Sequence, residues 1–115
     1  MNKVNKITEK KIIKALTEVC EKAKTEINGF QWLTHFVDYK QFPDSLKVVC
    51  VFSTQTELLS AQHKALDQII FTLIQNKLEK VGIQIKNIKK HVYFDSEEAC
   101  NSENNGNWDE RVRSH

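Results

Sequence analysis

Between Thr54 and Gly82, apolar residues recur at intervals of three and four, which is the pattern of one face of a helix. Thr54 and Glu57 have the spacing of a capping box, so we expect the helix to begin there. Gly82 suits the left-handed position that follows the last turn of a helix. The pattern predicts a helix of about 40 Å at a rise of about 1.5 Å per residue, with Ser60 as a place where it could break.

A second helical pattern lies near the N-terminus, after a short start that we expect to be disordered. Thr8 is placed to cap the first turn, and Asn28-Gly29 is a typical C-terminal cap. The apolar stripe of this helix comprises Ile12, Ile13, Leu16, Val19, Cys20, Ala23 and Ile27. Lysines and glutamates mix on its outer face, which is typical of a solvated helix surface.

The period changes to that of strands in three places. Residues 30–39 and 46–52 are rich in aromatic and β-branched residues, and the turn residues around Pro43 join them into a predicted hairpin. The unbroken apolar run of the second strand predicts that it is covered on both sides. Residues 83–94 alternate as well, but the phase reverses at Lys86-Asn87, so we predict a third strand with a bulge there.

The predicted element order is helix, strand, strand, helix, strand. Both helices have a single apolar face, so we predict an α+β fold, a two-layer sandwich with two helices on one face of a three-stranded sheet. The second and third strands should run in the same direction. If the third strand pairs beside the first, the order in the sheet is two-one-three. The other sheet face is partly apolar, and a second subunit is one candidate to cover it.

Residues 1–94 form the predicted domain, and residues 95–115 have the composition of a disordered, acidic, Asn-rich tail. Trp108 is unusual in such a tail and is a candidate to dock in a groove of this chain or of another chain. The first 94 residues carry fifteen Lys and Arg against nine Asp and Glu, a net charge of +6, whereas the tail carries two against six, a net charge of −4. This division predicts an anionic partner for the body or masking of the body by the tail, although mixed charge also serves solubility alone.

The composition, 40% apolar and 28% charged, is that of an ordinary soluble globular protein. The N-terminal residues lack the apolar core of a signal peptide, and no apolar run is long enough to span a bilayer, so we expect a cytoplasmic protein with no membrane partner. Cys20, Cys50 and Cys100 lie far apart with no C-x-x-C, so neither a disulfide framework nor a zinc finger is indicated. We expect the first two in the core and Cys100 exposed in the tail.

The sequence contains little that indicates catalysis. It lacks the motifs of phosphate-binding loops, zinc proteases and serine hydrolases. His35 and His91 would face each other only if the first and third strands were neighbours, and with Asp38 they could then hold a metal, although a histidine on a half-exposed strand is usually an ordinary surface residue. Cys50 lies in an apolar strand, where burial raises the pKa of a thiol and makes it unreactive. We therefore predict a non-enzymatic protein without a cofactor or metal.

Basic residues gather near the third predicted strand in a pattern that indicates nucleic-acid binding. Lysines can neutralise the phosphate backbone of RNA or DNA, and an aromatic side chain beside them can stack on an unpaired base. The candidate nucleic-acid-binding residues are Lys77, Lys80, Lys86, Lys89, Lys90, His91 and Tyr93. The alternative is that lysines on an edge strand prevent edge-to-edge aggregation without any ligand.

The order helix-strand-strand-helix-strand over residues 8–94 resembles that of type II KH-like domains, such as bacterial ribosome-maturation factors. The resemblance implies RNA binding by a domain of this topology. The G-x-x-G loop through which KH domains clamp the RNA backbone is absent here, so their binding residues cannot be carried over to this chain.

Together these features predict a small accessory or regulatory protein that binds nucleic acid or a ribonucleoprotein through the basic edge of its third strand. The alternative is a protein–protein adaptor or homodimer that uses the apolar sheet face around Trp32, Phe36 and Tyr39. The two differ in salt dependence, because phosphate contacts weaken steeply with salt and an apolar interface does not.

Overall fold

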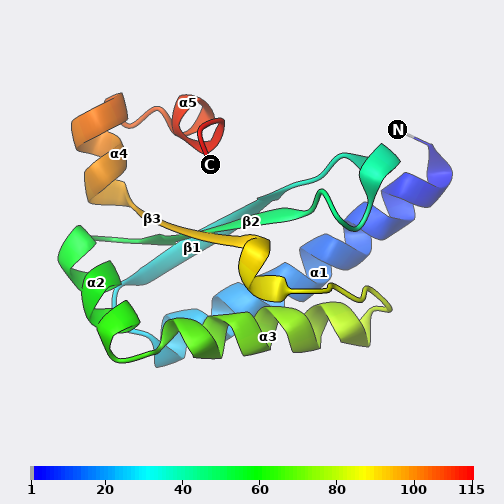
Figure 1. Ribbon diagram of the computed structural model, residues 1–115, viewed down its shortest axis with the longest axis horizontal. Helices are drawn as coiled ribbons and strands as arrows, with labels where there is room; N and C mark the ends of the chain where they lie inside the picture. The colour runs from blue at the N-terminus through cyan, green and yellow to red at the C-terminus, as the bar shows by residue number, and fades with distance from the viewer. Residues whose placement is uncertain (1) are drawn as a thin grey trace.

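The computed structural model describes residues 2–115 and contains a three-stranded sheet with helices on both faces (Figure 1). In chain order the elements are α1 (Lys3–Glu26), β1 (Phe30–Phe36), the 3₁₀ turn η1 (Tyr39–Gln41), β2 (Lys47–Phe52), α2 (Gln55–His63), α3 (Asp67–Lys80), the 3₁₀ turn η2 (Ile88–Lys90), β3 (Val92–Ser96), α4 (Glu97–Asn104) and α5 (Trp108–Val112). Among these residues no helix is both long and apolar enough to cross a membrane.

The central strand of the sheet is β2, which is antiparallel to β1 and parallel to β3. The predicted hairpin and the common direction of the second and third strands are confirmed. The order two-one-three is wrong, because β3 pairs with β2 and not with β1. Every residue of β2 from Val48 to Phe52 is buried. A strand with such a continuous apolar run needs cover on both faces. Because β2 is central, it also has a neighbouring strand along each edge, β1 on one side and β3 on the other.

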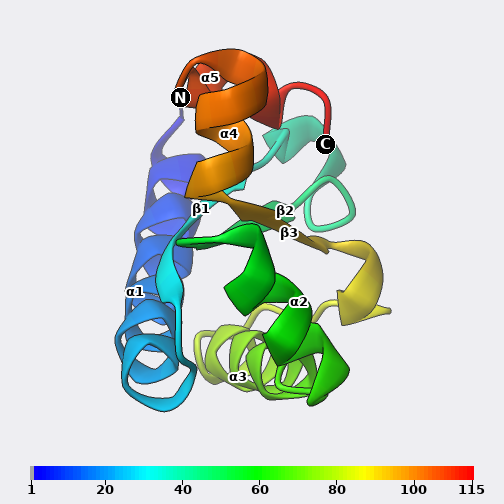
Figure 2. The ribbon, with the colours of Figure 1, turned by 90° about the vertical axis from the view of Figure 1, so that its left-hand side faces the viewer.

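α1 and α3 lie side by side and cover one face of the sheet, as Figure 2 shows from the end of the molecule. The predicted α+β fold, with two helices on one face of a three-stranded sheet, is therefore confirmed. Their apolar stripes meet alternate residues of β2 in the main core. Fully buried members of this core include Ile12, Leu16, Val19, Val48, Cys50, Phe52, Ile70, Ile74 and Leu78.

The long helix predicted from Thr54 is broken into α2 and α3. Its start is as predicted, since the Glu57 N–H donates to Thr54 Oγ1 at 3.1 Å, and so is its end, since Gly82 has a φ of +84°. The break lies at Ala65, which adopts a φ of +59°, and not near Ser60. The next N–H, that of Leu66, donates to the Ala61 carbonyl at 2.8 Å, which closes α2 in the manner of a Schellman motif. An alanine in the left-handed conformation gives no sequence signal, because glycine is the usual residue there.

The first helix begins earlier than predicted. The Asn2 side chain accepts from the Asn5 N–H at 2.8 Å and caps α1 at Lys3, so the residues from Lys3 onward are helical and not disordered. Thr8 is not the cap, because its hydroxyl donates to the Val4 carbonyl within the helix at 3.1 Å. At the other end, Gly29 has a φ of +87° and turns the chain into β1, which agrees with the predicted cap.

Residues 83–91 do not form a strand, so the predicted third strand with a bulge is wrong before Val92. Ile83 and Ile85 are buried, which explains the alternation, but this segment does not pair with any strand of the sheet. Asn87 has a φ of +61°, and this left-handed residue reverses the phase by starting η2. Alternation here reflects an extended segment with one buried side and not a ladder of backbone hydrogen bonds.

Residues 95–115 are folded, in contrast to the predicted disordered tail. Ser96 caps α4 and Asn107 caps α5 through their side chains. Both helices lie on the sheet face opposite α1 and α3 (Figure 1), where Val49 and Val51 are fully buried. The partly apolar face is thus covered by this chain itself.

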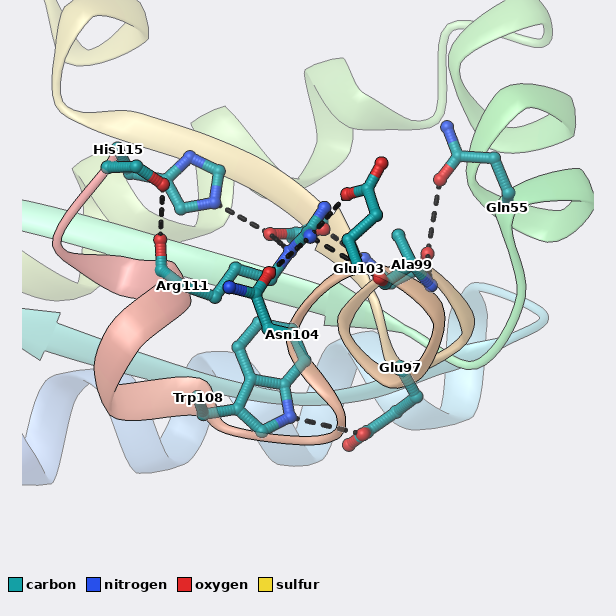
Figure 3. A network of polar contacts seen from close by, with 11 residues as sticks. Gln55, Glu97, Ala99, Glu103, Asn104, Trp108, Arg111 and His115 are labelled. Carbon is teal, nitrogen blue, oxygen red and sulfur yellow. Dashed lines mark hydrogen bonds and ion pairs between the residues drawn. The ribbon is translucent and has the colours of Figure 1, made fainter.

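Two tryptophans and a polar network attach this C-terminal segment. Trp108 packs edge-to-face on Trp32 with ring centroids 4.9 Å apart, so it docks within its own chain. Arg111 donates to Asp95 of β3 at 2.6 Å and to Glu103 of α4 at 2.5 Å, as part of the network in Figure 3. Cys100 is fully buried in α4, which corrects its predicted exposure.

Candidate nucleic-acid interface

Four of the predicted binding residues are exposed lysines: Lys80, Lys86, Lys89 and Lys90. Lys80 ends α3, and the other three lie in the loop and η2 turn that connect α3 to β3. None of the four forms an ion pair with another residue in the range 2–115. We call these four residues the lysine loop. Exposed ammonium groups without a carboxylate partner are available to an anionic ligand.

Lys77 is placed differently, although it lies only three residues before Lys80. Its ammonium group pairs with Glu18 Oε1 of α1 at 3.2 Å, and its side chain is 24% exposed. The pair connects the two helices that cover the sheet. Lys77 therefore contributes to the packing of α1 on α3 more than to a free basic surface.

His91 holds the loop to the sheet. Its Nδ1 donates to the Leu46 carbonyl at 2.6 Å, which fixes the proton on that nitrogen, and its own carbonyl accepts from the Val48 N–H at 2.8 Å. Both bonds attach the residue before β3 to the start of β2. These contacts give His91 a structural role.

Tyr93 lies on the wrong face of the sheet to join the lysine loop. It is opposite Val49 in the register of β2 and β3, and both side chains point away from α1 and α3. Lys47 Nζ lies 5.6 Å from the centre of the Tyr93 ring, and the His115 ring packs at 5.8 Å. The predicted aromatic partner is therefore turned toward the C-terminal segment.

Phe71 of α3 takes the position beside the lysine loop that the sequence indicated for Tyr93. Lys89 Nζ lies over the Phe71 ring, 5.8 Å from its centre. The ring is half-buried and packs edge-to-face on Phe94 at 5.7 Å and 74°. The apolar stripe of α3 concealed this residue, because a Phe next to Ile70 is interpreted as core. Phe71 is not one of the residues Ile70, Ile74 and Leu78, which repeat every four positions and are fully buried. This offset from the buried stripe is the one signal that could have distinguished Phe71 from a core residue.

A shallow depression of about 250 Å³ lies between α3 and η2 at this point. Phe71 and Ile88 form its apolar part, and Gln68, Thr72, Gln75 and Lys89 contribute polar groups. The Gln75 amide is held in place, since its Nε2 donates to the Ile85 carbonyl at 3.1 Å. The surface thus combines an aromatic ring, amides and nearby ammonium groups.

Of the three residues predicted to form a protein interface, Trp32 and Tyr39 make contacts within this chain. Trp32 packs on Trp108 and donates from Nε1 to Glu97 at 2.5 Å. The Tyr39 hydroxyl donates to Glu9 Oε2 of α1 at 2.7 Å. Only Phe36 of the three is exposed, at 41%. The three residues do not form one open apolar surface.

The histidines do not come together. His35 contacts Glu9, whereas His91 binds a backbone carbonyl, and β2 lies between the strand of one and the turn before the strand of the other. Asp38 caps η1 by accepting from the Lys40 N–H at 3.0 Å. Within residues 2–115 there is no group of three or more side chains that could hold a metal.

Burial raises the pKa of the Cys50 thiol, as the sequence predicts for a cysteine inside an apolar strand. Burial also raises the pKa of Cys100. A raised pKa keeps both thiols protonated at neutral pH, and a thiol in that form is a poor nucleophile.

No family model, curated protein or solved structure matches this chain. The resemblance to type II KH-like domains consequently rests on the order of elements alone.

Proposed function

We propose that this protein binds nucleic acid without catalysing a reaction, as an accessory or regulatory protein, and that the lysine loop is its binding surface. The observation that carries this proposal is the exposure of Lys80 at the end of α3 and of Lys86, Lys89 and Lys90 in the connection that follows, with no carboxylate partner elsewhere in residues 2–115. Unpaired ammonium groups neutralise phosphates and release the cations condensed on the nucleic acid, and this release provides most of the affinity in non-specific binding to nucleic acids.

The placement of these lysines weakens the alternative explanation for them. Lysines protect sheet edges only when they lie on an edge strand. Lys86, Lys89 and Lys90 precede β3, which begins at Val92. A role in blocking strand pairing does not account for lysines in a loop.

An apolar homodimer or adaptor surface on the sheet receives less support. α5 covers the face that contains Trp32, and Val49 and Val51 beneath it are fully buried. A partner could reach this face only by displacing the C-terminal segment. We therefore do not propose it as the main binding surface.

The test is binding of fluorescently labelled mixed-sequence RNA and DNA, measured by anisotropy between 50 and 300 mM salt. Four phosphate contacts predict a loss in affinity of about 100-fold or more over this range. The variant Lys86→Glu/Lys89→Glu/Lys90→Glu should lose binding. The matched control is Lys10→Glu/Lys11→Glu/Lys14→Glu on α1, which changes the net charge equally.

Equal loss in both triple variants would show that total charge, and not the lysine loop, attracts the nucleic acid. Absence of binding to any nucleic acid at 50 mM salt would overturn the proposed function.

A further inference from the structure

We infer that the depression between α3 and η2 binds an unpaired nucleobase against Phe71, so that the ligand of the lysine loop is single-stranded nucleic acid. The inference rests on the proposed function and adds a class of ligand to it. It depends on three features: an accessible ring face, polar groups that line the same depression, and exposed lysines in the adjoining connection.

The ring face of Phe71 is the accessible part. A cation over a ring occupies its face, and Lys89 Nζ lies over this ring at 5.8 Å from the centre. Lys89 is itself exposed, so the face that it covers points out of the protein. The edge-to-face contact with Phe94 holds the ring in one orientation. A rigid aromatic face of this kind is the platform on which bases stack in single-strand-binding proteins.

The polar groups around the ring match the edge of a base. Gln68, Thr72 and Gln75 line the depression together with Phe71. Amide and hydroxyl groups can both donate and accept, as the Watson–Crick edge of an unpaired base requires. Gln75 Nε2 donates both to the Ile85 carbonyl and to Glu79 Oε1, so the Gln75 amide is already fixed and presents its oxygen as an acceptor at little cost in entropy.

Lys89, which covers the Phe71 ring, would have to move when a base stacks there. When a base stacks on Phe71, the Lys89 ammonium leaves the ring face and can reach the phosphate of the same nucleotide. Lys86 and Lys90 are exposed in the same connection and can take the neighbouring phosphates. One nucleotide in the depression thus brings its backbone onto the lysine loop.

A duplex cannot use this site, because its bases are stacked and paired inside the helix. A duplex would contact only the lysines. The inference therefore predicts a preference for single strands that depends on the Phe71 ring, in addition to a salt-dependent attraction that does not depend on it.

The experiment measures anisotropy at 100 mM salt with a labelled 12-nucleotide single strand, with the same strand in a duplex, and with polyphosphate as competitor. The variants are Phe71→Leu, which removes the ring, and Phe71→Tyr, which keeps it. Loss of one stacked base predicts that Phe71→Leu binds the single strand at least about fivefold more weakly. Phe71→Tyr should bind it about as tightly as the original protein, and duplex binding should be the same in all three proteins.

The outcomes separate the inference from the proposed function. If Phe71→Leu melts at the temperature of the original protein and weakens single-strand and duplex binding equally, or weakens neither, while the lysine-loop variant abolishes both, the base site is wrong and the proposed function stands. If the original protein prefers the duplex, the inference is also overturned. A fold defect in Phe71→Leu would lower its melting temperature in circular dichroism and would weaken duplex binding too, so Phe71→Tyr and the duplex keep the test decisive.

Discussion

Arg111 of α5 donates from Nε to Oδ2 of Asp95 on β3 at 2.6 Å, and this pair joins the C-terminal segment to the sheet. Asp95 is only 4% exposed. Burial raises the pKa of its carboxyl group, but hydrogen bonds from Arg111, His115 and the Ser96 N–H outweigh this effect, so the pKa lies below its usual value. The C-terminal segment, rich in Asp, Glu and Asn, is thus held by this charge pair in addition to the packing of Trp108 on Trp32.

Removing the charge of Asp95 should weaken the attachment of the C-terminal segment to the sheet and lower the stability of the protein. Asp95→Asn keeps the shape of the side chain but leaves the largely buried Arg111 with only the exposed Glu103 as an anionic partner, and we expect the free energy of unfolding to fall by about 2 kcal/mol. Urea unfolding followed by circular dichroism measures the change. The control is Asp109→Asn, the same substitution at an exposed position of α5, which should change stability by less than about 0.5 kcal/mol. Similar losses in both variants would contradict a special role for the pair.

The same pair predicts how stability depends on pH. Because the folded pKa of Asp95 lies below that of an unfolded aspartate, its contribution is present above about pH 4 and is lost as the pH falls through the folded value. The stability difference between the original protein and Asp95→Asn should therefore be largest near pH 7 and should shrink below about pH 4. Glu9 also has a lowered pKa, but both proteins retain it, so its effect cancels in the difference. A difference that stays constant down to pH 3 would argue against this account.

Trp32 and Trp108 are the two tryptophans of the chain, and both indole N–H groups donate to Glu97, at 2.5 and 3.2 Å. Intrinsic fluorescence therefore reports on docking of the C-terminal segment. We expect Trp108→Ala to reduce the free energy of unfolding by about 2 kcal/mol, and Trp108→Phe, which keeps an aromatic ring on Trp32, to cost less. In the original protein the fluorescence and circular dichroism transitions should coincide in urea. An earlier fluorescence transition would show that the segment undocks before the domain unfolds.

Gly29 and Gly82 both have positive φ values, +87° and +84°, but their surroundings differ. A Cβ atom at Gly29 would lie 2.6 Å from Glu57 Cβ, whereas one at Gly82 would have no atom within 4 Å. Gly82→Ala should therefore cost about 1 kcal/mol from backbone conformation alone. Gly29→Ala should cost clearly more, about 3 kcal/mol or above, because it also displaces the first turn of α2. Thermal unfolding of the two variants compares them, and equal losses would exclude the steric contribution.

Lys77 and Lys86 should separate stability from binding. Lys77→Ala breaks a partly exposed pair with Glu18, so we expect a loss of about 0.5 kcal/mol in unfolding free energy and unchanged affinity for nucleic acid. Lys86→Ala should leave stability unchanged and lower the slope of log affinity against log salt by about 0.7 to 1. Urea unfolding and salt-dependent anisotropy give the two values. If Lys77→Ala also lowers the slope of log affinity against log salt, Lys77 contacts the nucleic acid and belongs to the binding surface.

Local chemistry was sufficient to predict the main elements. The capping box at Thr54, the left-handed Gly29 and Gly82, and the apolar run of β2 each depend on residues within one or two turns. The errors have long-range causes. The left-handed Ala65 is stabilised by the way Leu66 packs on the core, and the tail folds because Arg111 finds Asp95 sixteen residues earlier in the chain.

The candidate site also has one part that the sequence predicted and one part that it did not. The lysines could be located from the sequence because a cluster of like charges stays exposed in almost any fold. The aromatic partner could not, because Phe71 and Lys89 are eighteen residues apart and meet only when η2 folds back on α3.

The sequence by itself determined the fold class, the types of the helices and strands up to the end of α3 and the basic character of one connection, since periodicity, capping and charge act over short distances. Only the tertiary structure decided the strand order, the cover on the second sheet face and the ring beside the lysine loop. These depend on which surfaces meet, and many pairs of apolar or charged segments are equally compatible until the whole chain packs.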